Sequence, residues 1–409
     1  MSFPRIAIIG AGPSGLTLAS ILQKNGLQCA VFELDKDAQS RDQGGIVDLH
    51  RGAGQAALEE AGLLEAFKKC IAPSFETMKM IRKDGQVAWD ENDTSENAPP
   101  ELSKDRPEID RSVLRDLLLS TVDPKSIQWN RKLVKVEAKE SATAKYNLNF
   151  TDGVEEGFDL VVGADGAWSK VRPLVTNEPP FYAGVSIIEL QAKQASETRP
   201  LLTNFVGKGS CFMFDEGRVL LCQQNGNDSV RIYAGVRQPE TWVEECGIDW
   251  TKPETARRIY AEQYFGDCHE DIKRVIAEEG SDALIPRKAY MLPVGLRWET
   301  RPGIAVIGDA AHLMTPFGGV GVNVAMTDSM NLAKALVKRT DDFATDPQGS
   351  LDAAVKEYEE EMFVRAKKNA EKTYKGLIGH FSADGVDRFV EKFQQIAKMI
   401  EEEKQQLKA

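Results

Sequence analysis

The chain has 409 residues, of which 42% are hydrophobic, 8% aromatic and 28% charged. This length and balance predict two associated globular domains, and no apolar run approaches the roughly 20 residues that a membrane-spanning helix needs. The formal net charge of −12 argues against a nucleic-acid partner, because binding to a phosphate backbone requires a basic surface.

The six cysteines and four histidines lack the spacing of a disulfide framework or a metal site. We therefore expect reduced thiols and no bound metal. The opening residues, MSFPRIAIIGAG, run directly into an expected strand and leave no room for a secretory signal peptide. We expect a cytoplasmic protein.

The segment RIAIIGAGPSGLTLASILQKNGLQCAVFE, residues 5–33, predicts a strand, a glycine turn, a helix and a second strand. Gly10, Gly12 and Gly15 form a G-x-G-x-x-G motif. The first glycine allows a tight turn, the second lets a pyrophosphate approach the backbone, and the third lets the helix pack closely on the strand. Glu33, at the end of the second strand, can accept hydrogen bonds from a ribose.

This motif predicts dinucleotide binding without distinguishing FAD from NAD(P). The helix that follows the turn begins near Ser14 and offers free N–H groups to an anion. The alternative is a glycine turn that only joins a strand to a helix.

The middle of the chain contains an expected exposed loop and an expected sheet. Residues 92–107, NDTSENAPPELSKDRP, are polar and contain three prolines. Residues 176–296 contain short alternating segments such as AGVSIIELQA, GSCFMFDEGRVLLCQQ and DSVRIYAGVR, which are typical of strands. We expect a mixed sheet here.

A second glycine-rich segment, GDAAHLMTPFGGVGVNVAMTD, covers residues 308–328. Asp309 follows a short apolar strand, so its carboxylate lies at the edge where parallel sheets bind ligands. Pro316 and the glycines at 318, 319 and 321 would bring the backbone close to a flat ligand. Val322 and Asn323 begin a helix whose N–H groups face partial negative charge, as on a reduced flavin. The alternative is an ordinary glycine-rich loop before a helix.

Five segments together resemble the single-component FAD-dependent aromatic hydroxylases, and among them the tetracycline-inactivating monooxygenases. They are GAGPSGLTLASIL, GGIVDLHRGAGQAALEEAGL, PEIDRSVLRDLLL, DLVVGADGAWSKVR and GDAAHLMTPFGGVGVN, and the resemblance extends over nearly the whole chain. It implies an α/β fold, in which a Rossmann-type, three-layer FAD-binding domain is interleaved with a mixed β-sheet substrate domain and followed by a long C-terminal helix.

The resemblance also implies domain boundaries. The FAD-binding domain would comprise residues 1–72, 108–175 and 297–372, and the substrate domain residues 73–107 and 176–296. Residues 373–409 would form a C-terminal bridging helix, whose apolar stripe runs from Val386 to Ile400. A partner-binding helix is the alternative for this last segment.

The resemblance assigns cofactor roles to individual residues. Glu33 would bind the adenosine ribose, Arg111 and Asp309 the pyrophosphate and ribityl region, and Asp48 would lie near the flavin. The loop from Pro316 and Gly318 to Gly321, Val322 and Asn323 would hold the ring edge, Arg41 would face NADPH, and Asp165 and Gly166 would form a turn on the flavin and nicotinamide side. The alternative for that last turn is a strand end with Ser169 starting a helix. No second G-x-G-x-x-G motif is present, so we expect NADPH to visit transiently.

The implied reaction is hydroxylation of an electron-rich phenol or enol carbon by O₂ through a flavin C4a-hydroperoxide, with NADPH consumed. The cofactor supplies this chemistry, so no catalytic side chain is assigned. A flavin oxidase or dehydrogenase, or a non-catalytic binding protein on the same scaffold, would share the FAD motifs. Glu189 stands where the tetracycline enzymes place a glutamine, so a multi-ring phenol or β-diketone is the expected substrate class. His312 either touches substrate or flavin, or packs under the loop.

Overall fold

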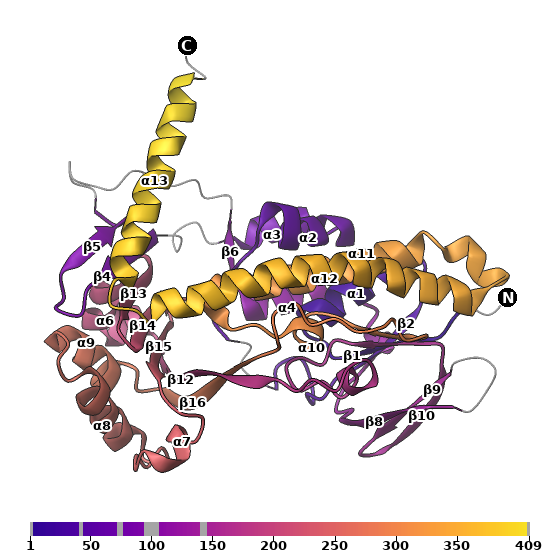
Figure 1. The fold of residues 1–409 in the computed structure, drawn as a ribbon, viewed down its shortest axis with the longest axis horizontal. Coiled ribbons are helices and arrows are strands. Elements are labelled where there is room, and N and C mark those ends of the chain that lie inside the picture. The colour runs from indigo at the N-terminus through magenta and orange to yellow at the C-terminus, as the bar shows by residue number, and fades with distance from the viewer. Residues whose placement is uncertain (1–2, 41–43, 72–76, 94–105, 140–144, 407–409) are drawn as a thin grey trace. The chain divides into compact units, whose positions relative to one another are not determined.

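The structure is a computed structural model that describes residues 3–40, 44–71, 77–93, 106–139 and 145–406. The chain divides into two compact units, each built from segments that are distant in the sequence (Figure 1). The first unit comprises residues 1–71, 111–181 and 290–374. The second unit comprises residues 72–110, 182–289 and 375–409.

The first unit alternates strands and helices. Its strands are β1 (Ile6–Ile9), β2 (Cys29–Phe32), β3 (Ile46–Asp48), β7 (Ile127–Gln128), β8 (Leu133–Ala138), β9 (Tyr146–Phe150), β10 (Gly153–Phe158), β11 (Leu160–Gly163) and β17 (Ile304–Val306). Its helices are α1 (Pro13–Lys24), the π-helical turn η1 (Arg51–Gln55), α2 (Ala56–Ala61), α3 (Leu64–Cys70), α4 (Arg111–Leu119), α10 (Asp309–His312), α11 (Gly321–Val337) and most of α12 (Pro347–His380). Short 3₁₀ turns are η3 (Pro124–Ser126), η4 (Arg172–Leu174), η6 (Pro316–Gly318) and η7 (Thr340–Ala344).

A five-stranded parallel sheet forms the centre of this unit, in the order β17-β11-β1-β2-β7. The apolar run of β1 is buried on both faces, as expected for a strand in the middle of such a sheet. Ile9 of β1 lies beside Gly163 of β11, which in turn lies beside Val306 of β17. The carboxyl ends of these three strands therefore meet at one edge, where both glycine-rich segments begin.

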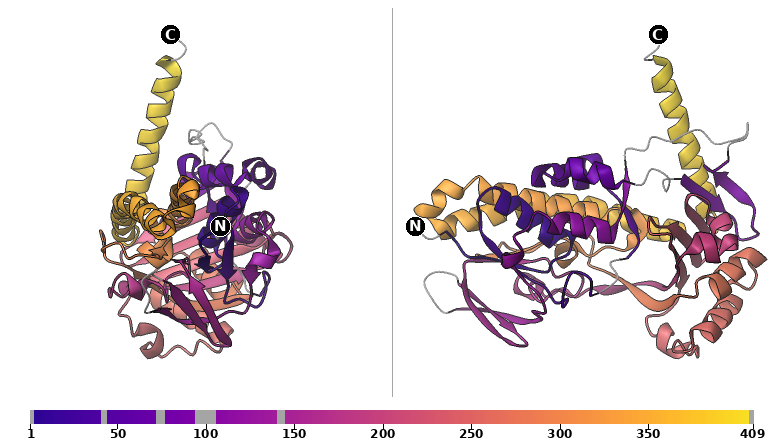
Figure 2. Two further views of the ribbon diagram at one scale, coloured as in Figure 1. Left: turned by 90° about the vertical axis from the view of Figure 1, so that its right-hand side faces the viewer. Right: turned by 180° about the vertical axis from the view of Figure 1, so that it is seen from behind.

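Helices α11 and α12 run side by side (Figures 1 and 2). Asp328 of α11 pairs with Arg365 of α12 at 2.8 Å, and Arg339, just after α11, pairs with Glu357 of α12 at 2.5 Å. Helix α1 packs against α11, and the hydroxyl of Ser329 on α11 donates to the carbonyl of Ser14 on α1 at 2.7 Å. The helix that follows the first glycine turn is thus fixed to the helix that follows the second.

The second unit contains a seven-stranded mixed sheet in the order β16-β12-β15-β14-β13-β4-β5. The strands of the second unit are β6 (Glu108–Asp110), which lies outside this sheet, and the seven of the sheet: β4 (Thr77–Ile81), β5 (Val87–Asp90), β12 (Phe181–Ala192), β13 (Gly209–Asp215), β14 (Arg218–Gln224), β15 (Val230–Arg237) and β16 (Ala283–Met291). Its helices are α5 (Ala195–Thr198), α6 (Pro200–Val206), α7 (Trp242–Glu245), α8 (Pro253–Phe265), α9 (Glu270–Arg274), the π-helical turn η5 (Val275–Glu279) and α13 (Gly385–Gln406).

One face of this sheet forms the core of the second unit. Alternate strand residues such as Leu190, Ile232 and Leu220 are buried there against α8 and its neighbours. The residues between them, including Glu189 and Tyr233, point to the opposite face, because successive side chains of a strand alternate.

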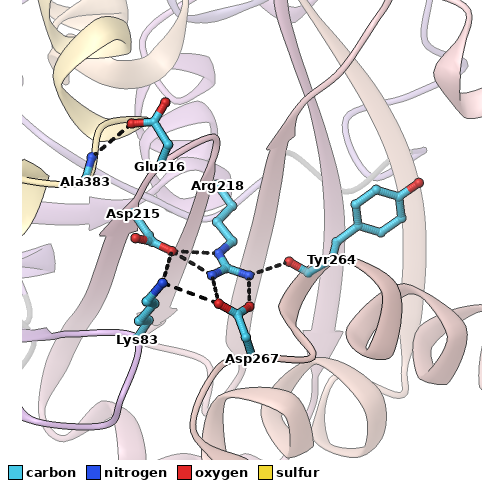
Figure 3. A network of polar contacts seen from close by, with 7 residues as sticks. All are labelled: Lys83, Asp215, Glu216, Arg218, Tyr264, Asp267 and Ala383. Carbon is cyan, nitrogen blue, oxygen red and sulfur yellow. Dashed lines mark hydrogen bonds and ion pairs between the residues drawn. The ribbon is translucent and has the colours of Figure 1, made fainter.

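A polar network holds the turn between β13 and β14 (Figure 3). Arg218 forms ion pairs with Asp215 at 2.7 Å and Asp267 at 2.5 Å, and it also donates to the carbonyl of Tyr264 at 2.9 Å. Lys83 lies 3.3 Å from Asp267. The hydrogen bonds from Arg218 lower the pKa of Asp267 and raise that of Arg218. The network joins the hairpin to the residues that follow α8.

The C-terminal segment contains a helix end, a turn and a further helix. Residues 373–380 continue α12, and α13 begins at Gly385. Its apolar stripe packs on the second unit, with the Phe389 ring 5.0 Å from Phe214 and the Phe393 ring 5.5 Å from Trp89. Across the described part of the chain, no helix combines the length and apolar character that a bilayer crossing needs.

Candidate functional site

The first glycine turn lies at the end of β1, and its three glycines have different surroundings. A Cβ atom on Gly10, whose φ is +109°, would lie 2.3 Å from the carbonyl oxygen of Ala164, and one on Gly15 would lie 1.9 Å from the carbonyl oxygen of Gly10. Packing therefore requires both of these glycines. A Cβ on Gly12 would meet no atom within 4 Å, so the space beside this residue at the start of α1 is open to a ligand.

Glu33 is buried behind this turn, with 5% of its surface exposed. Its Oε2 accepts a hydrogen bond from the Ala11 N–H at 2.5 Å, and its Oε1 accepts one from the Asp35 N–H at 2.9 Å. The carboxylate therefore holds the glycine turn to the end of β2. Each oxygen retains a second lone pair that can accept a hydroxyl group.

The second glycine-rich segment meets the first at Gly308. This residue has φ of +59°, and a Cβ there would lie 3.2 Å from the Ser14 hydroxyl oxygen and 3.0 Å from the Ala325 methyl group. The residues between β17 and α10 thus lie directly against the start of α1. This contact joins two motifs that are nearly three hundred residues apart in the sequence.

Asp309 is the first residue of α10, and its side chain is exposed. Desolvation by the surrounding protein nevertheless raises its pKa, while the charges of His312, Arg111 and Arg172 partly lower it. Arg111 begins α4 and donates its backbone N–H to Gly45 at 3.2 Å. An acid surrounded by three basic side chains can accept hydrogen bonds from a hydroxylated ligand.

The turn after β11 is the third element at this edge. Arg172 ties it to α10 by donating to the carbonyls of Ala310 at 3.3 Å and Ala167 at 2.8 Å. Asp165 accepts the Lys170 N–H at 2.6 Å, and its pKa is raised by burial. The positions of these groups are compatible with the sequence-based hypothesis of a turn at the cofactor. The Ser169 hydroxyl accepts the N–H groups of Val171 at 3.1 Å and Arg172 at 2.9 Å, so it also caps the 3₁₀ turn η4, as the alternative expects.

The glycines between Pro316 and Asn323 also divide into packed and open positions. A Cβ on Gly318 would lie 2.3 Å from the hydroxyl oxygen of Thr373 on α12, and Gly319 has φ of +59°. Gly321 begins α11 and has no atom within 4 Å of a Cβ position. Pro316 is exposed. Gly318 therefore serves helix packing, while Gly321 leaves its helix N-terminus open.

Asn323 is almost fully buried, with 1% of its surface exposed, and its side chain holds the segment after β3. Its Oδ1 accepts the N–H groups of His50 at 2.8 Å and Gly54 at 3.2 Å, and its Nδ2 donates to the Asp48 carbonyl at 2.8 Å. The Asp48 carboxylate lies 3.0 Å from His50 Nε2. The side chain of Asn323 thus positions Asp48, and its backbone N–H, like that of Val322, is available at the start of α11.

His312 packs beneath the loop. Its Nε2 lies 2.5 Å from Oδ2 of Asp328, whose other oxygen accepts a hydrogen bond from Arg365 at 2.8 Å. Asp328 is the last residue of the second glycine-rich segment, but the sequence assigned it no role, and Arg365 belongs to none of the motifs named above. The one available signal was an acid, Asp328, in the otherwise uncharged start of α11, VNVAMTD.

Two further residues were named from the sequence. Arg41 lies outside the described residues. Glu189 belongs to the second unit, where it pairs with Arg231 at 2.5 Å and with Arg287.

Comparisons with known proteins identify the class of this fold. The family model described as FAD binding domain matches residues 5–371. The chain is 33% identical to Monooxygenase penA of Penicillium thymicola, over 94% of this chain and 97% of that protein. It is 27% identical to 3-amino-4-hydroxybenzoate 2-monooxygenase of Streptomyces cremeus, over 87% and 82% of the two chains.

Solved structures show the same fold. Klebsiella pneumoniae HpxO, complexed with FAD and uric acid, aligns with a TM-score of 0.72 at 21% identity, over 97% of this chain and 93% of that one. The tetracycline destructase Tet(55) aligns with a TM-score of 0.71 at 16% identity, over 97% and 96%. The resemblance to flavin hydroxylases is confirmed, and the tetracycline destructase has the same fold. The chain belongs to the FAD-binding-domain family and is an FAD-dependent monooxygenase.

Proposed function

We propose that this monooxygenase hydroxylates an electron-rich phenol or enol carbon of a multi-ring small molecule, with NADPH as the electron donor and O₂ as the oxygen source. A tetracycline-like β-diketone is one member of this substrate class. The curated relative named for 3-amino-4-hydroxybenzoate acts on an electron-rich aromatic ring, which supports the proposal.

The proposed substrate class rests on a row of side chains across the seven-stranded sheet of the second unit. Phe212 of β13 pairs with Leu221 of β14, which pairs with Tyr233 of β15, which pairs with Glu189 of β12. These four side chains point away from the core, and the first three are partly exposed. Rings and aliphatic groups in one flat row suit a planar, fused-ring ligand.

A second, polar row runs beside the first. Ser210, Gln223 and Arg231 are paired across the strands β13, β14 and β15. A ligand lying on the apolar row would meet hydroxyl, amide and guanidinium groups along one side. A multi-ring molecule with hydroxyl or carbonyl groups on one edge matches this arrangement.

We propose that FAD lies along the edge of the first sheet. The open space beside Gly12 and the N-terminus of α1 would receive the pyrophosphate. Glu33 would accept the ribose hydroxyls, and Asp309, supported by Arg111, would bind the ribityl chain. The open N–H groups from Gly321 to Asn323 would face the partial negative charge of the ring, with Asp48 nearby.

When bound and reduced, FAD supplies the activation of O₂. The residues of this chain would bind and orient FAD. Gly12 and Gly321 would let it approach the backbone, and the packed residues Gly10, Gly15 and Gly318 fix the turns on which those two glycines lie. Arg41 would contact NADPH, because a guanidinium group can bind a phosphate in a bidentate manner.

The decisive experiment is a substrate screen of phenols and β-diketones that follows NADPH consumption and product mass, repeated under ¹⁸O₂. Incorporation of one labelled oxygen atom is the expected result. Oxidation without the label would favour a flavin oxidase or dehydrogenase, and a protein that binds ligands but never consumes NADPH would favour a binding role.

A further inference from the structure

The one-turn helix α10 is closed by a single buried carboxylate. Asp328 has no exposed surface. Its Oδ2 accepts the backbone N–H of Gly308 at 2.9 Å, just before the helix, and also contacts Nε2 of His312 at 2.5 Å, the last residue of the helix. One oxygen atom therefore joins the two ends of the turn that carries Asp309.

This turn cannot hold its shape by local interactions alone. Helix α10 spans four residues, and helices far shorter than about 12 residues are unstable by themselves. Gly308 also adopts a left-handed φ of +59°. The direction in which Asp309 points therefore depends on contacts from outside the turn, and Asp328 supplies them at both ends.

We call the contacts of Asp328 with Gly308 and His312 the Asp328 clamp. Arg365 on α12 fixes the carboxylate of this clamp, because it donates to Oδ1 of Asp328 at 2.8 Å. Burial by itself raises the pKa of Asp328 and lowers that of His312. The attraction between the two side chains reverses both effects, helped by Arg365 at Asp328 and by the charge of Asp309 at His312. The charged side chains around His312 are Asp328, Asp309 and Arg365, with Arg111 and Arg172 facing Asp309. The carboxylate is therefore ionised and paired.

We propose that Asp328 is a positioning residue for FAD, which acts by holding α10 so that Asp309 faces the ribityl chain. This inference rests on the proposed role of Asp309 in FAD binding. Asp328 has no exposed surface, so in this proposal it acts on the ligand only through α10.

The chain offers a matched control for a purely structural effect. Glu359 on α12 is also buried, with 1% of its surface exposed, and it accepts hydrogen bonds from Trp298 at 2.7 Å and Thr300 at 2.6 Å. Glu359 fixes the segment before β17. Among the described residues, its side chain forms no hydrogen bond or ion pair with Gly308 or His312. Glu359→Gln should lower thermal stability without changing FAD affinity.

The test is a double-mutant cycle between Asp328→Asn and Asp309→Asn, read as the dissociation constant of FAD. Dilution of the purified holoenzyme releases flavin, whose fluorescence reports the free fraction. We expect each single variant to weaken FAD binding about tenfold, a change typical of one lost contact to a charged group. The double variant should bind no more weakly than Asp309→Asn, because Asp328 acts through Asp309.

Different failures have different meanings. Unchanged FAD affinity in Asp309→Asn would remove Asp309 from the FAD site and overturn the proposed role of that residue. Two results would overturn only the positioning role of Asp328. One is a loss of FAD affinity in the double variant equal to the sum of the two single losses, in free energy. The other is a loss of FAD affinity in Asp328→Asn no larger than that in Glu359→Gln. If Asp328→Asn does not fold, His312→Gln, which keeps a donor, and His312→Leu, which removes it, give the same comparison: only the leucine variant should weaken FAD binding.

Discussion

Oε2 of Glu33 accepts the backbone N–H of Ala11 at 2.5 Å, across 22 residues of sequence. This bond places the acid that ends β2 directly against the glycine turn that ends β1. A residue expected to bind a ribose is thus also part of the framework of the neighbouring pyrophosphate turn, so its substitution should affect both stability and FAD binding.

Glu33→Gln should lower the free energy of unfolding by about 1–3 kcal/mol, because an amide can leave either the Ala11 or the Asp35 N–H without its acceptor. FAD content after purification should fall as well. Chemical denaturation and the ratio of flavin to protein absorbance measure the two effects. Stability equal to that of the unchanged protein would contradict the framework role.

Gly12→Val should abolish FAD binding while the protein still folds, since a Cβ there meets no atom within 4 Å and the side chain would fill the space proposed for the pyrophosphate. Gly15→Val is the contrasting variant, because its Cβ would lie 1.9 Å from the Gly10 carbonyl oxygen. We expect a colourless protein with native circular dichroism for Gly12→Val and an unfolded chain for Gly15→Val. Normal flavin content in Gly12→Val would place the pyrophosphate elsewhere.

The ion pair of His312 and Asp328 should make the stability of the fold depend on pH. The pKa of His312 lies above its ordinary value of 6.5, so its contribution to stability is complete below that value and is lost as the pH rises through the folded-state pKa. The pKa of Asp328 lies below its ordinary 3.8, so its contribution is present above that value and is lost only at lower pH.

Thermal unfolding from about pH 6 to about pH 9 checks the alkaline arm of this prediction. The unchanged protein should lose stability toward the upper end, and His312→Gln should lose less over the same interval, because its side chain does not titrate. Identical slopes for the two proteins would mean that His312 is not charged in the folded state.

Substitutions of Glu189 and Arg287 should have different effects: the first should lower stability, and the second should weaken substrate binding. Glu189→Gln removes one charged hydrogen-bond partner of the buried Arg231 and should cost roughly 1.5–3 kcal/mol of stability. The Arg287 side chain is 57% exposed, so Arg287→Ala should change stability by less than about 1 kcal/mol. If the substrate lies on this sheet face, Arg287→Ala should raise KM with a stable fold, measured by NADPH consumption against substrate concentration.

Arg41→Ala should raise the apparent dissociation constant of NADPH in stopped-flow flavin reduction, while FAD content and thermal stability stay near those of the unchanged protein. The reason is loss of a guanidinium contact to phosphate. An unaltered dependence of the reduction rate on NADPH concentration would assign Arg41 to the solvated surface of its loop.

The sequence by itself determined the elements that depend on neighbours along the chain. The apolar run of β1, the G-x-G-x-x-G turn with α1, and the start of the helix near Val322 follow from local sterics and periodicity. The alternating segments that form β12 to β15 likewise predicted a mixed sheet. In addition, the shared motifs identified the family, because they combine both glycine-rich segments in order.

Only the tertiary structure decided which glycines are required by packing and which leave space for a ligand. Gly318 and Gly321 look equivalent in the sequence, yet one packs against Thr373 and the other is open. The Asp328 clamp and its contact with Arg365 were also hidden, because they join residues that are 16 and 37 positions apart in the sequence. Such contacts depend on how α10, α11 and α12 pack, and local periodicity carries no information about which buried charges that packing brings together.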